Sequence, residues 1–307
     1  MKYVLGISLG SSRRDYEAEV RVGNQAFRVK RVGTDGDLGA AAGLIRHYDG
    51  LAAAFGLGGV NLWYRVGNRR YPLPDGQRLA RMARETPVVD GSGLKEGVEP
   101  ALVTYLRQEH GWSFEGRRVL LTSALDRWDL AQAFEKAGAR LLIGDPLFGL
   151  RFPLRFHSLE TFAAVARFTL PVLRHLPIHR LYPVGKAQEE ARPGFRWAFE
   201  WAEIVAGDFH FVRRYAPDLE GKTVIASTVT AEDAELLRQK GAKTLVSIYP
   251  CFGRRAFGAN VVEALLVAVA ENRGGRGRGL TPQDLGQMYW NELRLRPQVI
   301  PLASRHT

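Results

Sequence analysis

Two kinds of hydrophobic pattern alternate along the first part of the chain. Residues 2–9 form a nearly continuous apolar run, which predicts a buried strand. Residues 15–32 alternate apolar with polar positions around a Gly-Asn pair, which predicts a half-buried hairpin. Residues 38–48 then have the spacing of a helix, and an apolar strand follows at 51–57. This part of the chain is therefore expected to form an α/β unit.

The same patterns predict a mixed series of short elements further along. They are a hairpin at 63–71, a helix at 77–85, a strand at 87–89, a helix at 97–109, a helix at 158–175, an irregular stretch at 177–193 and an aromatic helix at 195–206. The order of strands and helices is typical of α/β proteins.

One strand–helix–strand unit occurs twice. The first copy has a strand at 118–123, a helix at 126–137 and a strand at 140–143. Its beginning, Gly116–Leu120, matches Gly221–Ile225 in a second copy that extends to 248. Such units pair their strands in parallel through right-handed crossovers. The match indicates a duplication, although unrelated units of this kind also resemble one another.

The predicted fold is therefore α/β, with two lobes of mainly parallel sheets and a Rossmann-like second lobe. We expect an N-terminal lobe with hairpins at 1–113, a C-terminal Rossmann-like lobe at 114–273, and a Gly/Arg linker with a last helix at 274–307. Thr281 is expected to cap that last helix, with Pro282 at its first position.

Composition narrows the class of protein. The net charge is +11, from 43 basic and 32 acidic residues, but the basic residues are spread along the chain rather than gathered in one arm. That spread does not favour a nucleic-acid partner, although the Gly/Arg run at 274–279 offers one short candidate. The single cysteine, Cys251, and the absence of a leader or membrane-spanning run favour a cytoplasmic protein, and the few Asn, Met and Cys residues would suit a thermophile.

Glycine-rich turns follow several of the predicted strands. They are at 33–37, 56–61, 90–95, 144–146 and 251–260. Open α/β sheets bind ligands beyond the carboxyl ends of their strands, and glycine there lets backbone N–H groups approach an anion. We expect a site for a small anionic or polyhydroxylated molecule.

Candidate catalytic residues lie in two of these turns. Asp35 precedes a helix that Asp37 is well placed to cap, so Asp35 is left for chemistry. Asp90, Ser92 and Lys95 lie within six residues of one another, and a lysine beside a buried carboxylate can take part in proton transfer to or from a substrate hydroxyl. The alternative is a loop that only caps the following helix.

Candidate cofactor and substrate ligands lie in two other turns. Gly56, Gly58, Gly59 and Asn61 could hold phosphate oxygens, although a hairpin rather than a helix is predicted next, so a tight turn is the alternative.

The substrate ligands are expected in the last of these turns. Arg254 and Arg255 suit a carboxylate or phosphate, and Asn260 begins a helix whose free N–H groups add to an anion site. Glu263 has capping-box spacing, and Cys251 is expected to be a buried small residue. The seven histidines include no pair of the HExxH kind, and a single cysteine excludes a Cys-rich zinc site.

Four segments together resemble a bacterial family commonly labelled quinate 5-dehydrogenase. They are Gly6–Ser12, Gly33–Asp37, Asp90–Lys95 and Gly253–Ala264. The resemblance extends over nearly the whole chain, with Arg255 and Ala259 in place of a serine and a threonine of the family pattern.

The label implies hydride transfer between a ring alcohol and NAD or NADP. Thr34-Asp35-Gly36 and the glycine turn at 56–59 are similar to motifs of shikimate-type dehydrogenases, which would make Asp35 the catalytic carboxylate and Gly58-Gly59 the cofactor loop. Only 33 residues precede Thr34, so the substrate domain that those enzymes place first is missing. A non-redox protein that binds a small molecule or a phosphate is the alternative.

Overall fold

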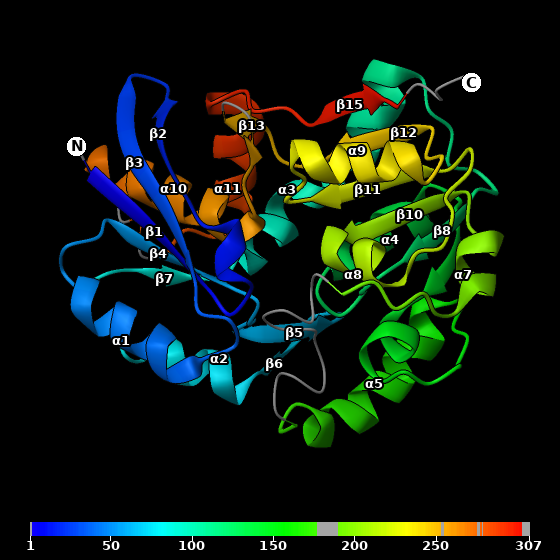
Figure 1. The fold of residues 1–307 in the computed structure, drawn as a ribbon, viewed down its shortest axis with the longest axis horizontal. Coiled ribbons are helices and arrows are strands. Elements are labelled where there is room, and N and C mark those ends of the chain that lie inside the picture. Colours follow the sequence, from blue (N-terminus) through cyan, green and yellow to red (C-terminus); the bar gives the residue numbers. More distant parts are fainter. Residues whose placement is uncertain (1, 177–189, 253–254, 275–276, 278, 303–307) are drawn as a thin grey trace.

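The fold is α/β, with two lobes whose main sheets are largely parallel (Figure 1). The structure is a computed structural model that describes residues 2–176, 190–252, 255–274, 277 and 279–302. Among the described residues, no helix has the length and apolar character needed to cross a membrane.

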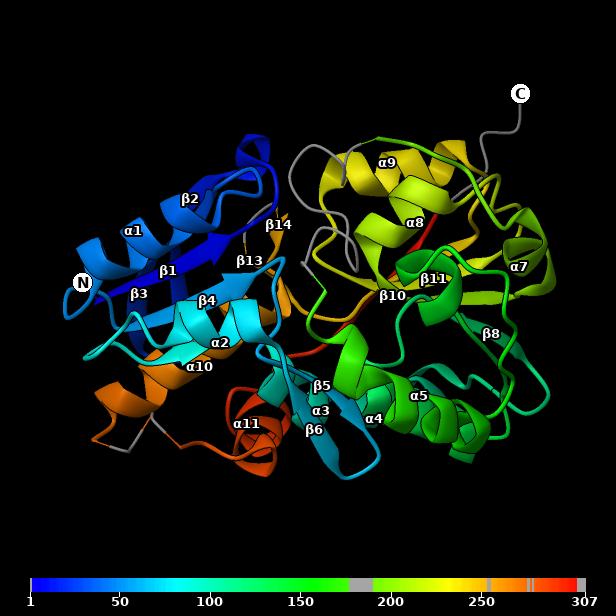
Figure 2. The same ribbon diagram turned by 90° about the horizontal axis from the view of Figure 1, so that it is seen from below.

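A five-stranded sheet forms the first lobe, in the order β2-β3-β1-β4-β7. All its pairs are parallel except the β2–β3 hairpin. The strands are β1 (Lys2–Ser8), β2 (Tyr16–Val22), β3 (Gln25–Gly33), β4 (Ala54–Gly58) and β7 (Val88–Val89). Helices α1 (Leu38–Tyr48) and α2 (Pro74–Ala80) lie on one face, and α10 (Ala259–Asn272) lies on the other (Figure 2).

The alternation along β1 explains this sandwich. Leu5 and Ile7 pack with residues of α1, whereas Val4 belongs to the core on the α10 side. Gly6 also faces α10, and a β-carbon there would stand 2.8 Å from the side chain of Val261. The sheet and helix therefore approach closely at this point. A separate hairpin, β5 (Trp63–Val66) and β6 (Arg69–Pro72), follows β4.

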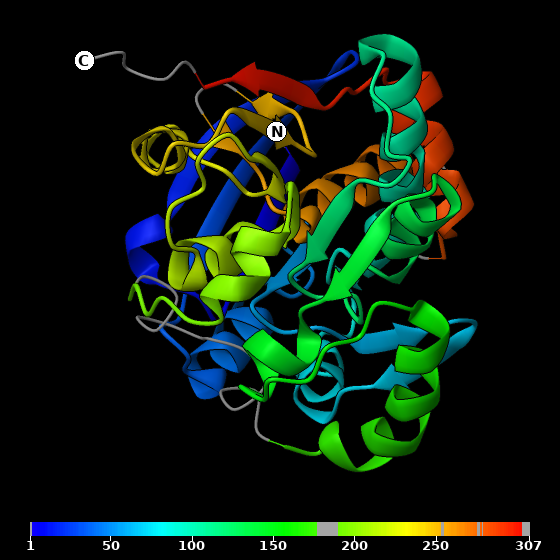
Figure 3. The same ribbon diagram turned by 90° about the vertical axis from the view of Figure 1, so that its right-hand side faces the viewer.

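The second lobe has a six-stranded sheet in the order β15-β12-β11-β10-β8-β9. Its strands are β8 (Arg118–Leu121), β9 (Arg140–Ile143), β10 (Ile204–Asp208), β11 (Thr223–Ser227), β12 (Thr244–Ser247) and β15 (Gln298–Pro301). Only β15 is antiparallel to its neighbour (Figure 3, red arrow at the top). Both predicted strand–helix–strand units are present, and they flank β10. Because the chain passes from β8 to β9 and later returns to β10 on the other side, the topological switch point lies between β8 and β10.

Helices cover both faces of this second sheet. Helices α7 (Arg196–Trp201), α8 (Phe209–Tyr215) and α9 (Ala231–Gln239) contribute to the core on one face. On the other face lie α3 (Ser92–His110) and α4 (Trp128–Lys136). Helix α11 (Pro282–Gln287) packs on α3, and α5 (Leu159–Leu173) packs beside α4. Short strands β13 (Cys251–Phe252) and β14 (Arg255–Ala256) pair just before α10. Thr281 caps α11 with Pro282 at its first position, so that prediction is confirmed.

Several segments differ from the sequence prediction. Helix α2 extends over Pro74–Ala80 rather than 77–85, since proline is favoured at the first position of a helix. The expected helix at 195–206 ends at Trp201, and β10 follows, because its apolar run is buried in the middle of the sheet. Helix α3 begins at Ser92 rather than 97, although it contains glycines and Pro100. Gly97 is needed there because a β-carbon would collide with the backbone carbonyl of Pro282, so packing overrides helix propensity.

The lobes are not continuous in sequence, and the expected boundaries at 113 and 273 do not follow the packing. Helix α10, expected in the second lobe, packs on β1 and β4 of the first. Strand β15, expected in an appended tail, completes the second sheet. Residues of α3, α4 and α10 join the two sheets in one hydrophobic core, so the lobes pack against each other.

Candidate functional site

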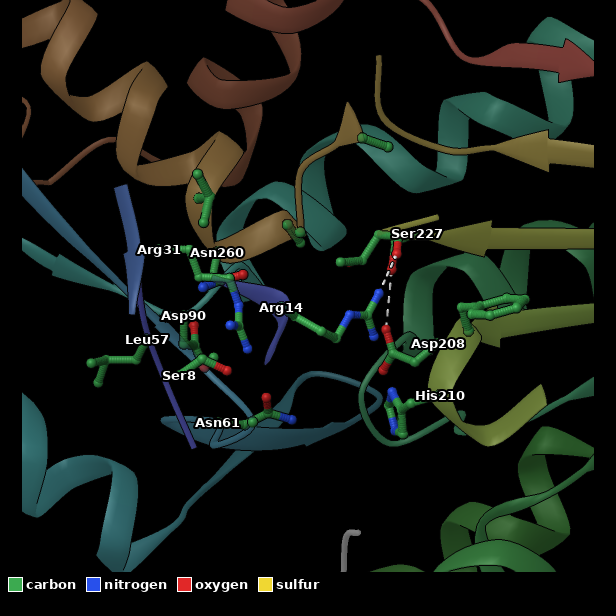
Figure 4. A pocket seen from close by; sticks show the side chains of 18 of the residues that line it. Ser8, Arg14, Arg31, Leu57, Asn61, Asp90, Asp208, His210, Ser227 and Asn260 are labelled. Atoms are coloured by element: carbon green, nitrogen blue, oxygen red, sulfur yellow. Dashed lines mark hydrogen bonds between the residues drawn. The ribbon is translucent and has the colours of Figure 1, made fainter. Parts of the chain in front are cut away.

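A cleft lies between the lobes, where the carboxyl ends of strands from both sheets face each other (Figure 4). Strands β1 and β4 end in it from one side, and β10 and β11 end in it from the other. Its cavity volume is about 120 Å³. The lining residues include Ser8, Arg14, Tyr16, Arg31, Gly58, Gly59, Asn61, Asp90, Lys95, Asp208, His210, Ser227, Thr228, Thr230, Gly258, Ala259 and Asn260.

The N-terminus of α10 opens into this cleft. Gly258 is its N-cap and offers no side-chain hydrogen bond to the first turn, which also contains no acidic residue. The first amides of a helix have no partners within the helix, and the helix dipole makes that end favourable for negative charge. Gly258, Ala259 and Asn260 all line the cleft, so this end of α10 presents positive potential to it.

Two arginines from the first lobe border the same space. Arg31, on β3, donates to the carbonyl of Ser11 at 3.0 Å and pairs with Asp15 at 2.8 Å. Arg14 donates to the carbonyl of Thr228 at 3.1 Å and pairs with Asp233 at 3.2 Å, so it crosses from the first lobe to the second. These contacts hold both guanidinium groups in fixed positions beside the cleft.

Lys95 lies at the base of the cleft and forms a buried ion pair. Its Nζ donates to both carboxylate oxygens of Asp126 at 2.7 Å, and Asn61 donates its side-chain amide to the same carboxylate at 2.7 Å. Burial opposes the charge on Lys95, but Asp126 and Asp208 outweigh it and raise the pKa of the ammonium. The partner of Lys95 is therefore Asp126, whereas the sequence suggested Asp35 or Asp90.

A second buried ion cluster supports the cleft from the other lobe. Arg127 is fully buried, pairs with Glu99, and donates to Asp208 at 2.5 Å and to Ser227 at 2.8 Å. Ser227 in turn donates to Asp208 at 3.1 Å, as Figure 4 shows. Desolvation lowers the pKa of the neighbouring His210 to about 4, so its ring is neutral at pH 7. The cluster fixes two polar side chains at the rim, one anionic and one hydroxyl.

Asp35 does not join this cleft. It is exposed, in a left-handed backbone conformation with φ of 51°, and its carboxylate accepts the backbone N–H of Ser12 at 3.0 Å. It is absent from the described lining, which corrects the prediction that Asp35 and Lys95 act together. Asp37 caps α1 as expected, accepting from the amides of Gly39 and Ala40.

Asp90 borders the cleft, but its two oxygens are occupied by structural bonds. It accepts from the backbone N–H of Leu62 at 2.6 Å and from both the N–H and the hydroxyl of Ser92. These bonds fit the alternative interpretation of the Asp90–Lys95 turn, a loop that caps the start of α3. Ser92 lies at the first position of α3, outside the residues that line the cleft.

The predicted cofactor loop does not have the form of a dinucleotide-binding turn. Gly56 lies within β4, where a β-carbon would stand 2.8 Å from the backbone carbonyl carbon of Asn260, so it serves helix–sheet packing. Gly58 and Gly59 do line the cleft, with Asn61, but the chain continues into the β5–β6 hairpin rather than into a helix. These residues therefore do not fit a dinucleotide pyrophosphate in the way that the resemblance implies.

The predicted substrate ligands are only partly described. Asn260 lines the cleft and donates its side-chain amide to the carbonyl of Gly56 at 3.0 Å. Arg254 lies outside the described residues, and of Arg255 the structure describes only the backbone, in β14. Cys251 is half-buried. Glu263 accepts from the amide of Leu94 at 3.3 Å and so supports the start of α3 instead of closing a capping box on its own helix.

Sequence reasoning missed five residues that complete the cleft. They are Ser8, Arg14, Arg31, Asp208 and Ser227. Ser8, Asp208 and Ser227 each end a strand, and the sequence predicted the strands that lead to Ser8 and Ser227. Asp208 was hidden because its strand was assigned to a helix. The two arginines carried no distinguishing signal in a chain rich in arginine.

No curated protein matches this sequence. Solved structures with partial similarity include a sugar ABC transport substrate-binding protein from Bordetella parapertussis 12822, at 14% identity over 90% of this chain and 81% of that one, with a TM-score of 0.34. They also include an NAD-dependent malic enzyme from Thermotoga maritima, at 12% identity over 95% and 84%, also with a TM-score of 0.34. Similarity at this level does not establish a shared function.

Two family models match the chain directly. The model described as Domain of unknown function (DUF8753) matches residues 3–90, and the model described as Domain of unknown function (DUF8754) matches residues 93–302. Because the second match alone extends over more than half of the sequence, the chain belongs to the family described as Domain of unknown function (DUF8754).

Proposed function

We propose that the cleft between the lobes binds a small polyhydroxylated anion, a sugar phosphate or a hydroxylated carboxylic acid, and that this binding is the function of the protein. The observation that carries the proposal is the convergence of the α10 N-terminus and Arg31 on one cleft. Oriented amides and a guanidinium are the donors that recognise phosphate and carboxylate.

The rest of the lining suits hydroxyl groups. Ser8, Asn61 and Ser227 offer hydroxyl and amide groups, and the carboxylate of Asp208 can accept a bond from a ligand hydroxyl. These groups come from both lobes, so a bound molecule would contact both. One hydrophobic core connects the two lobes, so it fixes the polar groups of one lobe relative to those of the other.

Thermal shift with a defined panel tests the proposal. The probes are quinate, ribose 5-phosphate, inorganic phosphate and the neutral polyol myo-inositol. A ligand of the folded state raises its stability by about 2.7 kcal/mol at a hundred times its Kd. We expect an anionic probe to raise Tm more than myo-inositol does. Equal responses to all four, or none, would contradict the proposal.

A pair of variants on one strand supplies the control. Arg31→Gln removes the charge at the cleft and is expected to weaken binding of the anion about tenfold or more, since charge-assisted bonds contribute about 1.5 to 3 kcal/mol. Arg28→Gln alters an arginine of the same strand that pairs with Glu17 and does not line the cleft. It is expected to bind like the wild type.

A second candidate is an NAD- or NADP-dependent dehydrogenase of a hydroxylated cyclic acid, of the quinate or shikimate type. The observation that favours it is the Lys95–Asp126 pair, since an ammonium coupled to a buried carboxylate can hold and pass on the proton of a ring hydroxyl. Formation of NADH or NADPH from quinate, lost in Lys95→Met, would support this candidate. Binding of quinate without any turnover would leave only the first.

A further inference from the structure

Thr228 has a backbone conformation that its residue type seldom adopts. It follows Ser227 at the end of β11 and has a φ of 60°, in the left-handed region. A β-branched side chain is strained there, whereas glycine tolerates this conformation. Strained conformations cost stability and are concentrated at functional sites, where the surrounding structure imposes them. Thr228 lines the cleft, so this strained residue lies at the proposed binding site.

Contacts on both sides of Thr228 impose its conformation. Ser227, just before it, accepts a hydrogen bond from the buried Arg127 at 2.8 Å. Thr230, just after it, is the N-cap of α9. Between them, the carbonyl of Thr228 accepts from Arg14 of the first lobe at 3.1 Å. The backbone is therefore fixed before, at and after the strained residue.

These backbone contacts do not explain the side chain of Thr228. Its hydroxyl forms no hydrogen bond within the part of the chain that the structure describes, and the residue is only half-buried, so its oxygen is accessible. This oxygen would stand 3.1 Å from a β-carbon placed on Gly258, the N-cap of α10. The hydroxyl of the second lobe therefore lies beside the first amides of α10, which packs on the first lobe.

An anion bound at the start of α10 would bring an acceptor oxygen to this hydroxyl. The first amides of the helix and Arg31 in the same cleft both favour negative charge there. A hydroxyl has one donor, and its bond to an ionised acceptor is about twice as strong as a bond between neutral groups. Such a bond would offset the strain in the backbone of Thr228.

We propose that Thr228 is a specificity-determining residue of the cleft, whose hydroxyl donates to the anionic group of the ligand. This inference rests on the proposed function. It gives the anion site a donor from the second lobe, so the site is complete only when both lobes contribute to it. Threonine is retained in a conformation that suits glycine because glycine has no hydroxyl to donate.

Two substitutions separate the hydroxyl from the shape of the side chain. The assay is calorimetric titration of the full chain with ribose 5-phosphate and with quinate. Thr228→Val keeps the branched shape and removes the hydroxyl, so the probe that binds the wild type should bind about tenfold more weakly. Thr228→Ser keeps the hydroxyl and should bind that probe like the wild type.

A third substitution tests the strain. Thr228→Gly relaxes the left-handed backbone, so the urea midpoint should rise by about 0.3 M while binding weakens as in Thr228→Val. Arg294→Gly is the control, because Arg294 is exposed, has a φ of 50° and does not line the cleft. It removes a side chain from the same backbone conformation and should leave binding unchanged.

The inference is overturned if Thr228→Val binds like the wild type, if Thr228→Ser loses as much affinity as Thr228→Val, or if Thr228→Gly lowers the urea midpoint. In each of these cases the wild type still binds, so the proposed function stands. If the wild type binds neither ribose 5-phosphate nor quinate, the proposed function fails together with the inference.

Discussion

The packing of α10 on the first sheet can be tested at Gly56, the residue that the sequence suggested as a cofactor ligand. In Gly56→Ala the new β-carbon would stand 2.8 Å from the carbonyl carbon of Asn260, closer still to its oxygen, and 3.2 Å from the amide nitrogen of Val261. Ordinary contact begins at 3.4 Å, so β4 and α10 must separate by at least 0.6 Å. Both sides are backbone and cannot turn away.

Overpacking of this kind costs typically 1 to 3 kcal/mol, and we expect the upper end, about 3 kcal/mol. With a urea m-value of about 3 kcal/mol/M, the unfolding midpoint should fall by about 1 M. Because α10 would be displaced at its first turn, anion binding in the cleft should weaken as well. A cofactor glycine would lose binding while keeping its stability.

Gly43→Ala is the matched control. Gly43 lies in the middle of α1, and a β-carbon there meets nothing within 4 Å. The same chemical change should stabilise the protein by about 0.5 to 1 kcal/mol, since alanine is the better helix former. Urea unfolding of both variants is the assay. Equal midpoints for the two variants, or an unchanged midpoint for Gly56→Ala, would refute the described contact.

Three further substitutions follow from the buried charges. Arg127→Leu leaves the carboxylates of Glu99 and Asp208 without their cationic partner and should lower the free energy of unfolding in urea by about 3 to 5 kcal/mol. A loss under 1 kcal/mol would mean that the cluster is not buried as described. Burial raises the pKa of Glu263 to about 8, above its ordinary 4.5, so the unfolded chain gives up this proton first and stability should fall as pH rises from about 4.5 to 8. Glu263→Gln should flatten that part of the stability–pH curve, and a curve of unchanged slope would contradict the assignment. Arg14→Ala removes the contacts of Arg14 with Thr228 and Asp233 across the cleft and should lower the free energy of unfolding by about 1 kcal/mol. Stopped-flow measurements should also show faster release of the ligand. An unchanged release rate would show that these contacts do not retain the ligand.

The sequence predicted the α/β fold and the strand–helix–strand units because their apolar runs are long and end in clear turns. It failed at β10, whose short apolar run continues an aromatic helix without a breaking residue. The return of α10 to the first lobe could not be predicted, since only contacts such as that of Gly6 with Val261 decide where a uniformly apolar helix packs.

The candidate site was predicted only in part, because contacts between distant segments decide which side chains reach the cleft. Lys95 and Asn260 follow glycine turns at strand ends, and the structure brings both to the cleft. Asp35 also follows a strand that ends in a glycine turn, but it has a left-handed backbone conformation. Its carboxylate accepts a hydrogen bond from the amide of Ser12 and does not line the cleft. Asp126 was not predicted as a site residue, because only the packing of α3 against α4 brings it to Lys95.

The most direct test of the account is the position of an anion in the crystal. Selenate mimics phosphate and sulfate, and its selenium gives an anomalous signal that marks its position without interpretation of the density. The account predicts an anomalous peak in the cleft, within hydrogen-bond distance of the Ala259 or Asn260 amide and of Arg31. Peaks confined to other surfaces of the protein, with the cleft empty at saturating selenate, would contradict it.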